Sequence, residues 1–475
     1  MVSPGATLSR HAGGTPVPRR IFPCLFLVFE ADRPLAPSVR FSLEGVDTVE
    51  VGRTSQLVAE RDGPSGRRLI IGLPDARVST SHAVLRYSSP SWLIEDTKSK
   101  NGTLINGRLE RRAELADGDL IELGHSFFLF REALASSAEE SALLKSSETQ
   151  AAASGLTTLV PSLVAELRKL EAIAASPVSV VLQGESGTGK EIVATAMHGL
   201  SGRSGPFLPV NCGGLPETLI ESELFGSCKG AFSGADKDRP GLVRSANRGT
   251  LFLDEIGELP ASAQTALLRV LQGGEILPIG ATHPIRVDVR FVTATNRNLE
   301  MLVARGLFRA DLLARISGFV VWLPPIRERR EDLGILIGAL LKRLLADRAG
   351  EISFSCDAAR ALLLYNWPLN VRELEKWLAA SIVLSGGHRI ELEHLPLRAQ
   401  RGQEISGAPS PKPGSDAVLQ AKRQECELRK REELVAVLRE HGGNVTAVAR
   451  TLGKARPQVQ RWMKRYGIDR GRVRT

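Results

Sequence analysis

The feature that most constrains this chain is a glycine-rich turn between an apolar run and a helix-like segment. The turn reads G-E-S-G-T-G-K-E over residues 184–191 and follows the apolar residues 177–183. A strand, a glycine-rich turn and a helix N-terminus bring backbone N–H groups to one point, where a nucleotide phosphate can bind. Lys190 adds a mobile positive charge. The residues predicted to contact the nucleotide are Gly184, Glu185, Ser186, Gly187, Thr188, Gly189, Lys190 and Glu191.

A second segment supplies the acids that a nucleotide-hydrolysing site needs. The apolar run 249–253 ends in Asp254 and Glu255. We expect Asp254 to hold Mg²⁺, mainly through water, and Glu255 to polarise the attacking water. Alternatively, two acids after a strand begin a helix, because Asp and Glu favour first turns. Glu191 stands where a Ser or Thr hydroxyl usually meets the metal, so another residue or water holds it.

The net positive charge of the chain is concentrated at its C-terminal end. A length of 475 residues suggests about three domains. Residues 417–475 carry 15 Lys or Arg against 6 Asp or Glu, which leaves 47 of each sign elsewhere. A neutral body with a basic tail indicates an anionic partner, most often nucleic acid. The alternative is a solvated basic face.

The cysteines and the hydropathy favour a cytoplasmic protein. The five cysteines lie far apart and form no C-x-x-C pair, which favours a reducing compartment and no structural zinc. No apolar run approaches the roughly 18 residues that a membrane helix needs, so no membrane partner is expected.

The first part of the chain predicts an all-β sandwich. Residues 1–19 are rich in Gly, Pro, Ser and Arg and are expected to be disordered. Short strand-like segments follow, with Asn-Gly and Asp-Gly turns. The expected strands are Cys24–Glu30, Ser38–Leu43, Thr48–Val51, Leu69–Gly72, His82–Tyr87, Trp92–Asp96, Thr103–Ile105, Asp119–Leu123 and Phe127–Arg131.

The turns of this region carry Gly52-Arg53, Ser79-Thr80-Ser81-His82 and Asn101-Gly102-Thr103. Their order and spacing resemble the forkhead-associated (FHA) domain, a phosphothreonine-binding module, over residues 20–131. The resemblance implies that Arg53 and Ser79 contact the phosphate, that His82 braces the loop and that Asn101 grips the peptide backbone. A guanidinium fork and a hydroxyl suit a phosphate dianion. Alternatively, these side chains only cap loops. Residues 132–154 are interpreted as a linker, with a helix as the alternative.

Residues 155–398 resemble the AAA+ ATPase domain of bacterial enhancer-binding proteins, which activate sigma-54 RNA polymerase. The matching segments are GESGTGKE at 184–191, NC at 211–212, ELFG at 223–226, GAFSGA at 230–235, GTLFLDEIGELP at 249–260, ATNR at 294–297, FRADLLAR at 308–315, LPPIRER at 323–329 and WPLNVREL at 367–374. This implies an α/β P-loop ATPase with a helical lid, with ATP and Mg²⁺ as cofactors. A helix is expected over Leu163–Ala175.

The resemblance assigns roles position by position. Asn211 matches a switch partner of Glu255, and Asn296 matches the sensor-I residue that reads the γ-phosphate. Arg309 and Arg315 match arginine fingers that reach into a neighbouring subunit, although ordinary surface arginines remain the alternative. Arg372 matches sensor II in the lid. The family forms hexameric rings, so a homo-oligomer is expected, and a resting dimer is possible.

The segment Gly230, Ala231, Phe232, Ser233, Gly234 and Ala235 resembles the GAFTGA loop that contacts sigma-54, with Ser in place of Thr. Phe232 would be an apolar tip between flexible glycines, and an exposed aromatic of this kind is typical of a contact element. The hydroxyl is kept in Ser233, so activity is expected to survive the change.

The C-terminal tail predicts a DNA-binding module. Residues 399–416 read as a linker. Residues 417–475 predict three short helices with glycine at the tight turn, which resembles the Fis-type helix-turn-helix. The residues predicted to face DNA are Arg456, Gln458, Gln460, Arg461 and Lys464, with the two glutamines reading bases and Arg461 and Lys464 contacting phosphates. Alternatively, the basic helix only packs on the ring.

Together these segments predict a multidomain chain: an FHA β-sandwich, an α/β AAA+ ATPase with a helical lid, and an all-α helix-turn-helix. The expected function is ATP-driven activation of sigma-54 RNA polymerase holoenzyme from enhancer DNA. A phosphothreonine protein from a Ser/Thr kinase pathway would control it. Two rivals remain open: a DNA-binding regulator or repressor with a silent ATPase, and a AAA+ remodelling factor for another protein.

Overall fold

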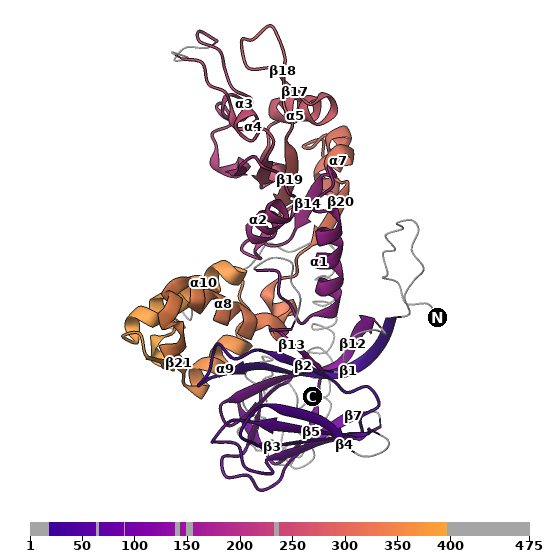
Figure 1. Ribbon diagram of the computed structural model, residues 1–475, viewed down its shortest axis with the longest axis vertical. Helices are drawn as coiled ribbons and strands as arrows, with labels where there is room; N and C mark the ends of the chain where they lie inside the picture. The colour runs from indigo at the N-terminus through magenta and orange to yellow at the C-terminus, as the bar shows by residue number, and fades with distance from the viewer. Residues whose placement is uncertain are drawn as a thin grey trace, which may run out of the picture. The chain divides into compact units, whose positions relative to one another are not determined.

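The computed structural model describes residues 19–62, 66–89, 91–137, 143–148, 155–231 and 237–396. The first of these segments form two sheets, with strand orders β13-β2-β1-β12-β11-β8-β9 and β10-β7-β6-β3-β5-β4 (Figure 1). The strands are β1 (Arg19–Glu30), β2 (Val39–Ser42), β3 (Thr48–Arg53), β4 (Val58–Asp62), β5 (Arg68–Leu73), β6 (Ala83–Ser88), β7 (Ser91–Asp96), β8 (Thr103–Ile105), β9 (Arg108–Glu110), β10 (Arg112–Leu115), β11 (Leu120–Leu123), β12 (Ser126–Ser137) and β13 (Leu143–Lys145).

Alternating side chains of the two sheets build one core between them. Leu25 and Leu27 on β1 and Phe128 and Phe130 on β12 are buried in the same cluster as Ile71 from the other sheet. Residues two apart in a strand lie on one face, so the strand periodicity of the sequence generates this core directly. Each fully buried Leu or Phe side chain contributes about 1.5–3 kcal/mol. The predicted all-β sandwich is confirmed.

The segment interpreted as a linker contains sheet instead. Strand β12 runs on to Ser137, and β13 pairs with β2 in the register Leu143↔Phe41 to Lys145↔Val39. Within the described residues, 132–148 therefore contribute strands and no helix. The short strand β13 adds to the open edge of β2, where unpaired backbone groups accept any extended segment. Three residues are too few to show the alternation of apolar and polar side chains from which a strand is predicted.

The nucleotide-binding domain is built on a five-stranded sheet in the order β15-β16-β19-β14-β20, and all its pairs are parallel. Its elements are α1 (Pro161–Ile173), β14 (Val180–Gln183), α2 (Lys190–Leu200), β15 (Phe207–Asn211), α3 (Ile220–Phe225), α4 (Leu242–Ser245), β16 (Thr250–Asp254), α5 (Ala261–Gly273), β17 (Glu275–Ile276), β18 (Ile285–Arg286), β19 (Arg290–Thr295), α6 (Leu299–Ala304), α7 (Ala310–Ile316) and β20 (Phe319–Trp322). The expected helix over 163–175 is present as α1, two residues earlier.

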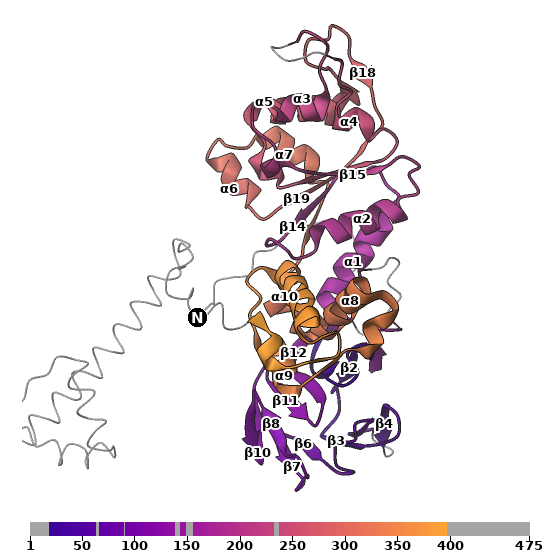
Figure 2. The same cartoon turned by 90° about the vertical axis from the view of Figure 1, so that its left-hand side faces the viewer.

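Helices cover both faces of this sheet, which explains its almost continuous apolar strands. Val180 and Leu182 of β14 pack in one cluster with α1 and α2. Val181 points to the other face and packs with helices that include α5, α6 and α7. Figure 2 shows α6 and α7 on the opposite side of the sheet from α2. In such doubly wound sheets, ligands bind at the carboxyl ends of the strands.

The lid follows β20 and is mainly helical. It comprises α8 (Leu333–Leu345), β21 (Ser353–Phe354), α9 (Cys356–Leu364), α10 (Asn370–Leu384) and β22 (Arg389–Ile390). Trp367 is fully buried, stacks edge-on against Tyr365 and Trp377, and donates from Nε1 to the Leu362 carbonyl at 3.0 Å. This aromatic cluster fixes the turn that leads into α10. The predicted helix-turn-helix of residues 417–475 lies outside the described residues. Among the described helices, none is long and apolar enough to cross a membrane.

Candidate functional site

The glycine-rich turn joins β14 to α2, as the sequence predicts. Gly187 and Gly189 have φ of 77° and 100°, a backbone region that favours glycine. A Cβ at Gly187 would lie 2.3 Å from the Leu369 carbonyl oxygen, so only glycine lets the lid approach this closely. Lys190 donates from Nζ to the Gly184 and Glu185 carbonyls, both at 2.9 Å. The turn is therefore closed by its own lysine.

A cavity of about 200 Å³ lies over this turn. Its lining consists of Ser186, Gly187, Gly189, Lys190, Glu191, Ile192, Asp254, Glu255, Asn296, Arg343, Val371, Arg372 and Glu375. The fold thus brings the predicted lysine, both acids, the sensor-I asparagine and the sensor-II arginine to one place, from the start of α2, the ends of β16 and β19, and α10. Burial lowers the pKa of Lys190, while Asp254 and Glu255 oppose that shift. A cation beside two carboxylates suits a nucleotide phosphate with a metal ion.

Glu255 directly follows β16 and has φ of 54°, in the left-handed region. A non-glycine residue in this region costs on the order of 1–3 kcal/mol and is often found at functional sites. Its N–H contacts Asp254 Oδ1 at 2.9 Å. The predicted partner Asn211 pairs with Asp254 across the sheet, but its Oδ1 accepts from the Gly213 and Gly214 N–H groups at 2.9 and 3.1 Å. Its side chain therefore caps a short turn here.

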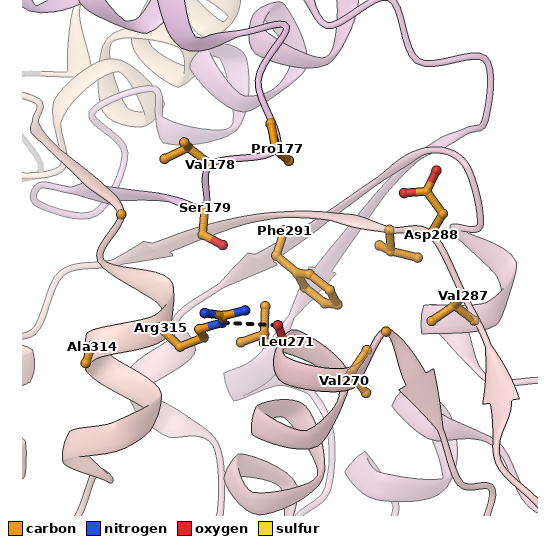
Figure 3. Close-up of a pocket in the computed structure, with 13 residues that line it drawn as sticks. Pro177, Val178, Ser179, Val270, Leu271, Val287, Asp288, Phe291, Ala314 and Arg315 are labelled. Carbon is orange, nitrogen blue, oxygen red and sulfur yellow. Dashed lines mark hydrogen bonds between the residues drawn. The ribbon is translucent and has the colours of Figure 1, made fainter.

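The predicted arginine fingers lie away from this cavity. Arg309 forms a two-pronged pair with Asp311, with contacts of 3.0 and 2.7 Å, on the surface at the start of α7. Arg315 donates from Nε to the Leu271 carbonyl at 3.2 Å. It lines a separate cavity of about 610 Å³ with Phe291 and Asp288 (Figure 3). Neither arginine is among the residues that line the cavity over the glycine-rich turn.

Lid residues that the sequence did not single out hold the glycine-rich turn. Arg329 is buried and donates from Nη2 to the Thr188 carbonyl at 2.8 Å. Arg327 pairs with Glu185, with Nη1 to Oε2 at 2.8 Å, and Asn370 donates to the Ser186 carbonyl at 3.1 Å. Arg343 and Glu375 also line the cavity.

Arg327 and Arg329 belong to the run LPPIRER, and Asn370 belongs to WPLNVREL. The sequence therefore shows these motifs, but it does not indicate that these residues contact the glycine-rich turn. Arg372, which was predicted, donates from Nη1 to Ser186 Oγ at 2.9 Å.

The stem of the GAFSGA segment is described, and its tip is not. Ser227 bridges to Arg239 across the base, and the Lys229 N–H contacts Asp238 Oδ1 at 2.7 Å. Gly230 has φ of 79°. Phe232, Ser233, Gly234 and Ala235 lie outside the described residues, as do the five residues predicted to face DNA.

The four predicted phosphopeptide residues gather at one end of the sandwich. Ser79 Oγ accepts from the Lys100 N–H at 3.1 Å. His82 is fully buried, with Nδ1 accepting from the Ser79 N–H and Nε2 facing the Gly102 carbonyl, both at 3.1 Å. His82 therefore connects the Ser79 N–H to the Gly102 carbonyl across the loop. Arg53 and Asn101 are exposed and carry donors that a phosphopeptide can use.

Comparison with known protein families agrees with each part of this architecture. Residues 51–124 match the FHA domain, residues 157–321 the sigma-54 interaction domain and residues 327–411 the AAA+ ATPase lid domain. Residues 428–466 match the bacterial regulatory protein, Fis family. A AAA+ domain of this kind binds and hydrolyses ATP.

The chain is also similar to regulatory proteins over about two thirds or more of their length. It is 40% identical over 316 residues to the regulatory protein AtoC of Escherichia coli K12, covering 66% of this chain and 68% of AtoC. It is 39% identical over 372 residues to the transcriptional regulatory protein ZraR of Klebsiella oxytoca, covering 78% and 79%. The structure of NtrX from Brucella abortus with ADP is 31% identical, with a TM-score of 0.47, over 66% of this chain and 70% of NtrX. The matches to AtoC and ZraR show that the chain belongs to the family of sigma-54-dependent transcriptional regulators, with an FHA domain before its AAA+ ATPase domain and a Fis-type helix-turn-helix after it.

Proposed function

We propose that this chain assembles into a homo-oligomeric ring that couples ATP hydrolysis to remodelling of sigma-54 RNA polymerase holoenzyme at promoters. Its FHA domain recognises a phosphothreonine protein, and its C-terminal tail binds enhancer DNA in the cytoplasm. The observation that carries the proposal is the meeting of Lys190, Asp254, Glu255 and Arg372 around one cavity. These four residues supply the protein groups that phosphoryl transfer needs, except for an arginine finger.

Four side chains of the cavity have separate tasks in hydrolysis. Lys190 offsets negative charge on the phosphates. Asp254 would hold Mg²⁺ through water, and the donor set fits, because two carboxylates lie beside the phosphate-binding lysine. When bound, Mg²⁺ supplies further neutralisation of phosphate charge. Glu255 accepts a proton from the attacking water, and Asn296 senses the γ-phosphate.

The placement of the fingers supports the ring. Arg309 and Arg315 lie outside the cavity of their own chain, so they complete a site only when a second copy contributes them. An arginine supplied in trans is worth about 10³–10⁵ in the rate of phosphoryl transfer. The motion that hydrolysis drives would reach sigma-54 through residues 230–235.

The FHA loops support control by phosphothreonine. The side chains of Arg53, Ser79 and Asn101 line one end of the sandwich, and His82 holds their loop from below. A guanidinium and a hydroxyl together bind a phosphate dianion through charge-assisted hydrogen bonds. The match to the FHA domain and this arrangement of side chains support the proposal that the loops bind a phosphopeptide.

The test is ATP hydrolysis measured against protein concentration for the wild type, Lys190→Ala and Arg309→Ala. Turnover per subunit should rise with concentration, and both substitutions should abolish it. Arg305→Ala is the matched control, because Arg305 is an exposed arginine four residues away. Turnover per subunit that stays constant down to concentrations at which the chain is monomeric would exclude the ring with fingers in trans. Sigma-54-dependent transcription with Phe232→Ala then tests the contact loop.

A further inference from the structure

The FHA sandwich docks on the lid of the ATPase through an interface of named contacts. Arg360 on α9 forms a two-pronged pair with the buried Glu122 on β11, with contacts of 2.8 and 3.0 Å. The main-chain N–H of Phe354 donates to the Ala31 carbonyl at 2.7 Å. Phe354 also packs edge-on against Phe29, with ring centroids 5.4 Å apart. Figure 2 shows α9 beside the β11 end of the sandwich.

Helix α8 approaches the sandwich so closely that it needs a glycine. A Cβ added at Gly334 would lie 1.8 Å from the Val28 carbonyl oxygen and 2.8 Å from Ser38 Oγ. Both atoms belong to the FHA domain. One turn later, a Cβ at Gly338 would lie 3.4 Å from the Pro34 carbonyl oxygen, an ordinary contact. The backbone of the lid is therefore fitted to the backbone of β1 at Gly334.

A single buried carboxylate joins this interface to the loop of residues 74–82, which carries Ser79 and His82. Asp75 is 1% exposed, and its Oδ1 accepts from the Arg77 N–H at 2.8 Å. Its Oδ2 accepts from the His125 N–H at 2.6 Å and the Ser126 hydroxyl at 3.1 Å. His125 lies in the turn between β11 and β12, and Ser126 begins β12. The same turn presents the Gly124 carbonyl to Cys356 Sγ of the lid at 3.4 Å.

The peptide-binding side chains hold the other end of this loop. Arg53 donates from Nη1 to the Ala76 carbonyl at 3.4 Å, and Asn101 donates from Nδ2 to the Arg77 carbonyl at 2.6 Å. A phosphothreonine peptide competes for these donors, because phosphate and peptide carbonyl oxygens accept from the same groups. Binding therefore withdraws hydrogen bonds from residues 76–77, which lie next to Asp75.

We propose that phosphothreonine binding and docking of the FHA sandwich on the lid oppose each other through Asp75 and the β11–β12 turn. The inference rests on the proposed recognition of phosphothreonine and adds its consequence for the ATPase. Peptide binding loosens the loop and then the contacts of Gly124 and Glu122 with α9. The lid, which holds the glycine-rich turn through Arg329 and Asn370, is thereby released from the sandwich.

Coupling between two equilibria is reciprocal, so an undocked lid must strengthen peptide binding by the factor with which the peptide weakens docking. Gly334→Ala tests this in the full-length chain. Alanine favours the helix itself, so the variant leaves the lid folded while its Cβ collides with Val28. Gly338→Ala is the matched control. Arg360→Glu, which places like charges opposite Glu122, is a second undocking variant, with the exposed Arg348→Glu as its control.

The probe is a fluorescein-labelled degenerate peptide library with one fixed phosphothreonine, titrated by anisotropy beside its unphosphorylated twin. We expect Gly334→Ala and Arg360→Glu to bind the phosphorylated library about fivefold tighter or more. The two controls should bind like the wild type. Hydrogen exchange at the Phe354 amide reports docking directly and should accelerate in both undocking variants. In the wild type, it should accelerate when the phosphorylated library is added.

The outcomes separate this inference from the proposed function. If the wild type prefers the phosphorylated library, loses that preference in Arg53→Ala, and binds no tighter when the Phe354 amide is exposed by either variant, recognition stands and the coupling is refuted. If no variant distinguishes the two libraries, phosphothreonine recognition fails, and the coupling fails with it.

Discussion

Arg329 donates from Nη2 to the main-chain carbonyl oxygen of Thr188 at 2.8 Å, so the segment that opens the lid holds the middle of the nucleotide-binding turn. Arg329 is 8% exposed, and burial lowers the pKa of its guanidinium. A buried charge of this kind is kept only where partners compensate for lost solvation. Asp332, three residues later, provides the opposing charge.

Replacing Arg329 by Met should weaken nucleotide binding about tenfold or more. A hydrogen bond to a charged group contributes about 1.5–3 kcal/mol, and its loss frees the turn that presents Lys190. The measurement is titration with a fluorescent ADP analogue. Arg348→Met is the control, since Arg348 is an exposed lid arginine that pairs with the nearby Glu351. Equal affinity in Arg329→Met and wild type would show that the turn is rigid by itself.

Arg327 contacts the same turn through Glu185, yet its removal should matter little. Both side chains are more than a third exposed, and exposed ion pairs contribute about 0.2–1 kcal/mol. Arg327→Gln should therefore change the affinity for the ADP analogue by less than about fivefold. A loss as large as that of Arg329→Met would mean that the pair orders the turn cooperatively.

The pH dependence of stability should report Asp332. Burial raises the pKa of Asp332 to about 6, and Arg329, Thr158 and Leu159 oppose the shift. The folded-state pKa lies above the unfolded value, so this carboxyl binds a proton more readily in the fold. Its contribution to stability is complete below about pH 4 and is lost as the pH rises through 6.

Asp332→Asn should remove that slope. An asparagine keeps an oxygen for the Leu159 N–H, which now contacts Asp332 Oδ1 at 2.8 Å. The wild type should lose on the order of 3 kcal/mol between pH 4 and 7 through this group, and the variant should lose correspondingly less. Urea unfolding followed by tryptophan fluorescence, to which the lid residues Trp367 and Trp377 contribute, measures the free energy of unfolding at each pH. Parallel pH profiles for both proteins would contradict the assignment.

The contiguous parts of the nucleotide site could be predicted because short motifs determine local geometry. The turn at 184–191 follows β14, and the two acids 254–255 lie at the end of β16. Parallel strands place those ends at one edge of the sheet. Contacts across the fold have no such signature. Arg329 reaches Thr188 over 141 residues of sequence, and neither residue belongs to a pattern that names the other.

The interface between the sandwich and the lid was not predictable for the same reason. Glu122 and Gly124 read as an ordinary strand and turn, and Gly334 as a helix residue of poor propensity. Only the tertiary structure shows that Gly334 faces the Val28 carbonyl. Gly334 has poor helix propensity, and it lies where the backbone of α8 meets the backbone of β1.

Ser79 and His82 should separate phosphate contact from loop support. Ser79→Ala removes an exposed hydroxyl contact and should lower affinity for the phosphothreonine library while leaving stability within about 0.5 kcal/mol. His82→Ala leaves the Ser79 N–H and Gly102 carbonyl without their buried partner. It should lose binding and cost about 1–3 kcal/mol. Thermal unfolding and anisotropy measured together distinguish the two. Equal stability losses would show that the loop depends on the hydroxyl as well.

Glu255→Gln should retain nucleotide binding and lose hydrolysis. The amide keeps the size of the side chain and its place beside Lys190 and Asp254, but it cannot accept a proton from water. Removal of a general base lowers the rate by about 10²–10⁴. Glu258→Gln is the matched control, because Glu258 pairs with Arg297 on the nearby surface and does not line the cavity. Steady-state phosphate release and binding of the ADP analogue separate the two effects. Hydrolysis above a tenth of the wild-type rate in Glu255→Gln would assign the proton transfer to another group, whereas lost binding would make Glu255 a structural residue whose left-handed backbone holds the edge of the cavity.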